Sequence, residues 1–74
     1  MELKDKAQAI RDASDNKNYE AMLRGIYNLD NSRMGSPEWY MSQIGSEAIS
    51  AYYAKDMTTM ESKINELVIA AYAC

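Results

Sequence analysis

SPEWYMSQIGSEAISAYYA, residues 36–54, is the stretch that decides the fold of this chain. It opens with a helix-start signature, because Ser36 suits an N-cap, Pro37 the first helical position and Glu38 the positive end of the helix dipole. At about 100° per residue, one side of the helix collects a continuous apolar face, which consists of Tyr40, Met41, Ile44, Ala48, Ala51 and Tyr52. The stretch therefore predicts an amphipathic helix over residues 37–54.

A second apolar stripe runs along another side of the same helix. We call it the aromatic stripe, and it consists of Trp39, Ile49 and Tyr53. Serines that would let another helix approach closely are interleaved with it: Ser42, Ser46 and Ser50. A small domain needs only one buried face from such a helix. Either this helix is central, packed on two sides by the first and last helices, or the aromatic stripe contacts a partner, because Trp and Tyr are enriched at binding hot spots.

Three further helices are predicted over residues 2–14, 19–29 and 58–73, because apolar residues recur there at helical spacing. The turn formers between the first two helices end at Asn18, which suits an N-cap. Residues 28–35, NLDNSRMG, are the clearest break in the chain. Since short connections favour antiparallel neighbours, the first two helices pair, as do the last two. The predicted fold is all-α: a small array of about four helices built from two antiparallel helical hairpins.

Two glycines and a repeated segment refine this prediction. Gly25 costs about 1 kcal/mol relative to alanine inside a helix, so we expect it to mark a close helix crossing. Gly45 is a point where the third helix can bend. The segments DNKNYEAM (15–22) and KDMTTMES (55–62) both join helices and lie about 40 residues apart, which indicates a pseudo-repeat.

The last helix carries its own start signal. Thr58 and Glu61 match a capping box, in which the hydroxyl and the carboxylate each satisfy a free backbone N–H. Ile69 and Tyr72 broaden the inner side of this helix, so we expect it to be well buried.

Size and charge exclude several classes of protein. The chain has 74 residues, of which 47% are hydrophobic and 26% charged, so residues 1–74 form a single globular domain. With 8 basic and 11 acidic residues the net charge is −3. General nucleic-acid binding depends on neutralising phosphates, so no direct nucleic-acid partner is expected.

The ends of the sequence bear on its location. The single cysteine, Cys74, allows no internal disulfide, which favours a reducing compartment. Residues 1–10 place charges where an export signal needs an apolar run. The apolar run 67–74 is far too short to span a bilayer. We therefore expect a cytoplasmic protein without membrane contact, located in the host cytoplasm if the protein is viral.

The residue types that most catalytic sites use are missing. There is no histidine, the commonest general base and metal ligand. The three glycines do not have the spacing of a phosphate-binding loop. The aspartates lack the alternating spacing of a calcium loop. We expect no enzyme activity, no cofactor and no metal site.

The leading hypothesis is a non-enzymatic binding protein that occupies a surface of a larger protein. Small acidic helical chains of this kind are typical of virus- or mobile-element-encoded inhibitors of host defence machines, so the expected partner is a nuclease or a nucleic-acid-binding complex. The expected contact residues are Trp39, Ile49, Tyr53, Glu38, Ser42 and Ser46. The alternatives are a self-associating assembly component, with a homodimer through the aromatic stripe, and a helical nucleic-acid-directed regulator. The regulator is the weaker alternative, because residues 36–74 offer only Lys55 and Lys63 for phosphate contacts.

Overall fold

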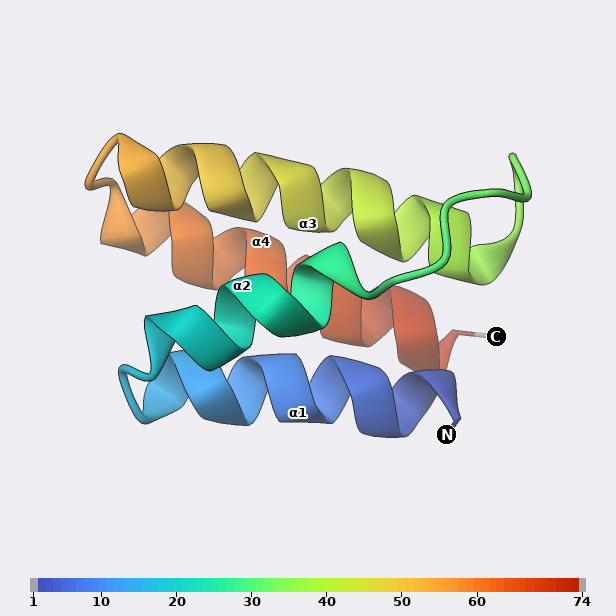
Figure 1. Ribbon diagram of the computed structural model, residues 1–74, viewed down its shortest axis with the longest axis horizontal. Helices are drawn as coiled ribbons and strands as arrows, with labels where there is room; N and C mark the ends of the chain where they lie inside the picture. The colour runs from blue at the N-terminus through green and yellow to red at the C-terminus, as the bar shows by residue number, and fades with distance from the viewer. Residues whose placement is uncertain (1, 74) are drawn as a thin grey trace.

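The computed structural model describes residues 2–73, and within this range the chain is helical with no strand. Figure 1 shows the helices in chain order: α1 (Leu3–Asp15), α2 (Tyr19–Tyr27), α3 (Pro37–Tyr53) and α4 (Met57–Tyr72). The predicted all-α fold is therefore confirmed. Each predicted helix is present, with bounds that differ from the expected ones by one or two residues.

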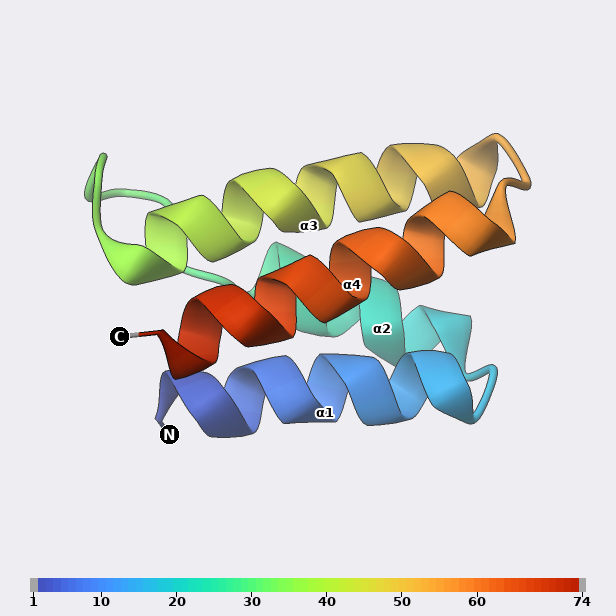
Figure 2. The same cartoon turned by 180° about the vertical axis from the view of Figure 1, so that it is seen from behind.

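The four helices form a bundle in which sequence neighbours lie side by side and run antiparallel. α1 packs against α2 and α3 packs against α4, as the two predicted hairpins require; α4 also contacts α1, and α2 also contacts α3. The two opposite views agree on this arrangement, with α2 on one side and α4 on the other of the pair α1 and α3 (Figures 1 and 2). α3 thus lies between α4 and α2, so the alternative of a central third helix is right about the last helix and wrong about the first.

The core fills the space enclosed by all four helices. Its side chains are aliphatic or methionine and come from the inner face of every helix and from the second residue after α2: Ala7, Ile10, Met22, Ile26, Leu29, Met41, Ala48, Ala51, Met60, Ile64, Leu67, Val68 and Ala71. Burying such side chains is the main favourable term in folding. Among residues 2–73, no buried side-chain nitrogen or oxygen lacks a hydrogen-bond partner. The interior is therefore mostly apolar, with Ser14 and Ser42 as its buried polar residues among those described.

Both helical glycines mark close approaches between helices. A Cβ on Gly25 would lie 2.8 Å from Cγ1 of Ile10, which confirms the predicted crossing of α1 and α2. A Cβ on Gly45 would lie 2.5 Å from Cγ2 of Ile26, and α3 continues through this position. Gly45 therefore allows α2 and α3 to pack closely, and it does not interrupt α3.

The two hairpins repeat the same turn. Lys17 and Lys55 have φ angles of 59° and 62°, a left-handed conformation that a helix C-terminus commonly uses. The residue after each lysine donates its backbone N–H five positions back, over 2.8 Å in the first turn and 2.9 Å in the second, and then caps the next helix with its side chain. Those residues are Asn18 and Asp56. The pseudo-repeat indicated by the sequence is thus present, in a register that pairs Lys17 with Lys55.

The same register also pairs buried positions along the helices. In this register Met22 corresponds to Met60, Ile26 to Ile64 and Leu29 to Leu67, and all six side chains are buried. The hairpins differ in length, because α2 ends at Tyr27 whereas α4 continues to Tyr72. Residues 28–36 therefore run as an irregular connection beside the first turns of α3 (Figure 1).

The start of α4 differs from the prediction. Asp56, not Thr58, is the N-cap, and its carboxylate accepts hydrogen bonds from the backbone N–H and the hydroxyl of Thr59. Thr58 lies inside the first turn, so the capping box with Glu61 is wrong. The left-handed residue Lys55 fixes the point at which the chain re-enters a helix, and that point selects the cap.

Three aromatic or aliphatic residues expected on inner faces are exposed. Tyr40 is 54% exposed, Ile69 is 67% exposed and Tyr72 is 54% exposed. The helical angle of a residue says on which side it lies, but a neighbouring helix has to extend over that side before the residue is buried. Both Ile69 and Tyr72 stay exposed, although Lys4 of α1 lies over the ring of Tyr72, so the breadth predicted for the inner side of α4 is wrong.

Candidate protein-binding surface

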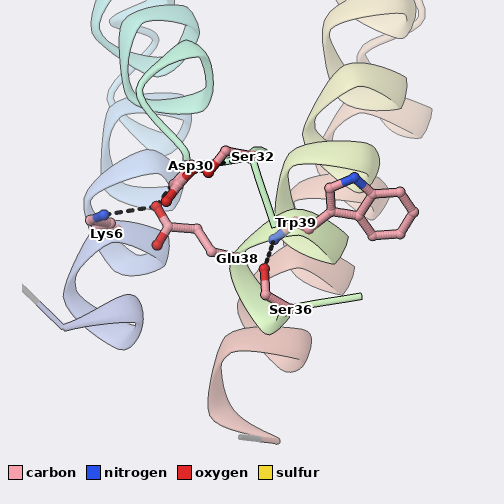
Figure 3. A network of polar contacts seen from close by, with 6 residues as sticks. All are labelled: Lys6, Asp30, Ser32, Ser36, Glu38 and Trp39. Atoms are coloured by element: carbon pink, nitrogen blue, oxygen red, sulfur yellow. Dashed lines mark hydrogen bonds and ion pairs between the residues drawn. The ribbon is translucent and has the colours of Figure 1, made fainter. Parts of the chain in front are cut away.

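The first turn of α3 positions the indole of Trp39. Ser36 caps the helix by accepting a hydrogen bond from the Trp39 backbone N–H at 3.1 Å, and Pro37 fills the first helical position. Both features follow from the sequence signature. Figure 3 shows the indole pointing away from the Glu38 carboxylate, which lies on the opposite side of the helix. The cap therefore fixes the directions in which the side chains of Glu38 and Trp39 leave the helix.

Glu38 belongs to the internal structure of the bundle. Its Oε2 accepts a hydrogen bond from Nζ of Lys6 on α1 at 2.8 Å and another from the backbone N–H of Asp30 at 2.7 Å (Figure 3). Only 17% of its side chain is exposed. Burial works against ionisation, but the hydrogen bonds from Lys6 and Asp30 more than offset it and hold the pKa of Glu38 below its usual value. Glu38 therefore ties α1, the 28–36 connection and α3 together.

Asp30 organises the connection itself. Its carboxylate accepts hydrogen bonds from the Ser32 hydroxyl at 2.6 Å and the Ser32 backbone N–H at 2.9 Å, and these two bonds lower the pKa of Asp30. The turn then continues to Gly35, whose φ of 86° is one that side-chain-bearing residues avoid. The connection is thus built from local polar contacts and carries no core side chain after Leu29.

Residues of the aromatic stripe and its serines differ in accessibility. Ser42 is only 7% exposed and donates its hydroxyl hydrogen to the carbonyl of Trp39 at 2.7 Å. Ile49 is partly buried against the core. Ser46 is exposed, and Trp39 is partly buried. The structure therefore brings Trp39, Ser46 and Tyr53 to the accessible side of α3 and turns Ser42 and Ile49 toward the bundle.

Aromatic rings gather at both ends of this accessible side. Near the start of α3, Trp39 and Tyr40 meet edge to face, with centroids 5.0 Å apart and planes at 78°. Near its end, the ring of Tyr52 lies 5.1 Å from that of Tyr19 on α2 and 5.2 Å from that of Tyr53. Tyr53 is 66% exposed. Offset and edge-to-face pairs of this kind hold aromatic rings in defined positions.

A hollow at the α3–α4 turn adjoins Tyr53. Four residues line it, Tyr52, Tyr53, Lys55 and Met57, and its volume is about 360 Å³. Sequence reasoning did not place Lys55 and Met57 among the contact residues, because the segment 55–62 was interpreted as a link between two helices. The signal that could have found them is the sequence YYAKDM, in which two aromatic residues precede a turn that ends in methionine.

Most acidic groups of the second hairpin are already engaged. Nζ of Lys63 on α4 lies 3.4 Å from a Glu66 oxygen and 3.5 Å from a Glu47 oxygen on α3. The hydrogen bond to Glu66 and the charge of Glu47 raise the pKa of Lys63. Asp56 caps α4, and its bonds to Thr59 lower its pKa. The hairpin therefore presents little unpaired negative charge.

The described residues hold neither a candidate metal centre nor a membrane-spanning helix. Within residues 2–73, no group of three or more His, Cys, Asp or Glu side chains is placed to hold a metal ion. None of the described helices combines the length and the hydrophobicity that crossing a bilayer requires. Cys74, which we expected to be an isolated thiol, lies outside the described residues.

Comparison with protein-family models, with curated proteins and with solved structures gives no match.

Proposed function

We propose that the protein is a non-enzymatic binding protein that occupies a surface of a larger protein through the accessible side of α3. The observation that carries the proposal is that Tyr53 is 66% exposed while its ring contacts that of Tyr52. Trp39 and Tyr40 extend the same aromatic character to the other end of the helix. Rigid, partly exposed Trp and Tyr rings are the side chains that dominate binding energy at protein interfaces.

The proposed target is a host nuclease or nucleic-acid-binding complex, with the protein acting as an inhibitor of viral or mobile-element type. The net charge of −3 favours a basic surface on such a target. Phosphate mimicry is the less favoured route, because Glu38, Glu47 and Glu66 are held by lysines of the same chain. Aromatic contacts then supply most of the affinity, and we expect complex formation to depend only weakly on salt.

Capture of a partner by the immobilised protein, with paired tyrosine variants, tests this proposal. Tyr53→Ala removes a ring from the proposed surface, whereas Tyr72→Ala removes a ring of comparable exposure, 54%, that stacks on Lys4 of α1. We expect a stoichiometric partner that is retained by Tyr72→Ala and lost by Tyr53→Ala, with both variants as helical as the wild type. If both variants retained the partner equally, the Tyr53 side of α3 would not be part of the interface.

A second candidate is self-association, favoured by the spacing of the accessible residues. Trp39, Ser46 and Tyr53 recur every seven residues, the period at which one helix packs along another. An antiparallel pair of α3 helices would place Trp39 of one copy beside Tyr53 of the other. Sedimentation velocity over a wide concentration range separates the candidates, because a dimer that dissociates on Tyr53→Ala supports self-association and a monomer throughout excludes it.

A further inference from the structure

The hollow at the α3–α4 turn has walls that are mostly carbon. Tyr52, Tyr53 and Met57 line it together with Lys55, which brings the one charged side chain among the four. Met57 is 37% exposed and Tyr53 is 66% exposed, so these groups are not part of the core. Its volume of about 360 Å³ is at the low end of ligand sites, which favours a single inserted side chain over a whole small molecule.

The walls are held in place before anything binds. The Tyr52 ring contacts Tyr19 on one side and Tyr53 on the other. The turn is fixed by backbone hydrogen bonds from Lys55 to the carbonyl of Tyr52, at 3.0 Å, and from Asp56 to the carbonyl of Ala51, at 2.9 Å. Walls that need no reordering lower the entropic cost of binding.

The charge at the edge of the hollow is uncompensated. Within residues 36–73, Lys63 is held by Glu47 and Glu66, and no carboxylate pairs with Lys55. The adjacent carboxylate of Asp56 is occupied by both donors of Thr59. The complement of such a site is an apolar side chain that has an anionic group close to it.

We propose that the hollow receives an anchor of the partner protein: a large apolar side chain with a carboxylate on the same residue or its neighbour. The apolar group inserts between Tyr53 and Met57, and the carboxylate lies beside the Lys55 ammonium. This inference rests on the proposed function and adds the chemistry of the segment that is recognised. It also places the strongest contact at the turn end of α3, where Lys55 and Met57 join Tyr53, which was already expected from the sequence.

The repeated turn of the first hairpin provides a matched control. Lys17 has the same backbone conformation as Lys55 and is followed by the same kind of N-cap. At the positions that correspond to Tyr52 and Tyr53, however, the first hairpin has Ser14 and Asp15. Lys17 thus offers a cation on the same turn without counterparts of Tyr52 and Tyr53, and with Tyr19 in the place of Met57.

The test uses two small probes that differ only in charge, N-acetyl-tryptophan with its free carboxylate and N-acetyl-tryptophan amide. Each is titrated into the ¹⁵N-labelled full chain, and amide shifts are followed by NMR. We expect saturable shifts centred on residues 52–57, with dissociation constants on the order of millimolar, as a single side chain allows. Lys55→Gln should weaken carboxylate binding by about threefold, the size of an exposed ion pair, and leave the neutral amide unaffected.

Two further variants complete the design. Met57→Ala should weaken both probes, because it removes part of the apolar wall, and Lys17→Gln should weaken neither. Shifts that do not saturate, that centre elsewhere, or that respond equally to Lys17→Gln and Lys55→Gln would overturn the inference. If capture of the partner requires Tyr53 but the probes do not bind in the hollow, the inference fails and the proposed function stands. If the probes bind as expected but no partner is captured, the proposed function fails, and the inferred protein anchor fails with it.

Discussion

Gly45→Ala should destabilise the protein although alanine is the better helix former. The substitution gains about 1 kcal/mol of helix propensity. The new Cβ would lie 2.5 Å from Cγ2 of Ile26, about 1 Å closer than ordinary carbon contacts allow. That methyl group is attached to Cβ of Ile26 and cannot swing away, so α2 and α3 have to separate. Overpacking of this kind costs about 1–3 kcal/mol, which leaves a net loss of about 1 kcal/mol.

Thermal denaturation followed by circular dichroism measures this loss. For a domain of this size, 1 kcal/mol corresponds to a fall of about 4–8 °C in Tm. Ile26→Leu is the matched second change, because it moves the branch away from Cβ and keeps the side-chain volume, at a cost of less than about 1.5 kcal/mol. In that background Gly45→Ala should be neutral or stabilising. A double-mutant cycle would then give a coupling energy of at least about 1 kcal/mol.

Two results would refute this reasoning. A rise in Tm for Gly45→Ala alone would mean that α2 yields without penalty, so that the crossing with α3 is loose. Additive effects of Gly45→Ala and Ile26→Leu would mean that the cost arises somewhere other than at this contact.

Three further predictions concern the first turn of α3 and its exposed end. Glu38→Gln should lower the free energy of unfolding by about 1 kcal/mol, because it weakens the contacts with Lys6 and Asp30. The pKa of Glu38 in the folded state lies below its usual value of 4.5, so the advantage of the wild type should be complete above pH 4.5 and disappear as the pH falls through the folded-state pKa. Urea unfolding of both proteins between pH 3 and 7 would show this. Ser36→Ala should cost about 1 kcal/mol through loss of the N-cap, and Ser36→Asn should restore most of it in the same melting assay, whereas no rescue would mean that the hydroxyl acts elsewhere. Tyr53→Ala should change the unfolding free energy by less than about 0.5 kcal/mol, since its ring is mostly exposed, and a loss of several kcal/mol would place it in the core.

Features that depend on neighbouring residues in the sequence were predictable. The caps at Asn18 and Ser36 and the close crossing at Gly25 each follow from a few adjacent side chains or from one missing side chain. The four helices follow from apolar periodicity in the same way. The cap of α4 was missed because Asp56 and Thr58 compete for the role, and the left-handed turn at Lys55 decides between them.

Features that depend on how the helices pack against one another were not predictable. Glu38 was interpreted as a contact residue because its partner Lys6 is 32 positions away, a distance at which no local pattern operates. Ser42 and Ile49 were expected on the binding surface because the helical angle gives the direction of each side chain. It does not show how far α2 extends over that side of α3. Tyr53 stays a candidate contact residue for the opposite reason, since no helix of the bundle extends over it.

The repeated turn has a consequence for the order of the hairpins along the chain. Lys17 and Lys55 close their hairpins with the same turn, and the hairpins contact each other through α1 with α4 and α2 with α3, so the core can form whichever hairpin comes first. Glu2 and Ala71 border one surface depression at the end of the bundle where the 28–36 connection also lies. A circular permutant that joins the present termini through a short glycine-rich linker and opens the chain between Ser32 and Arg33 should therefore reach the same bundle with α3 as its first helix. Its folding would show that this protein is specified as a pair of interchangeable units and not as a fixed sequence of four helices.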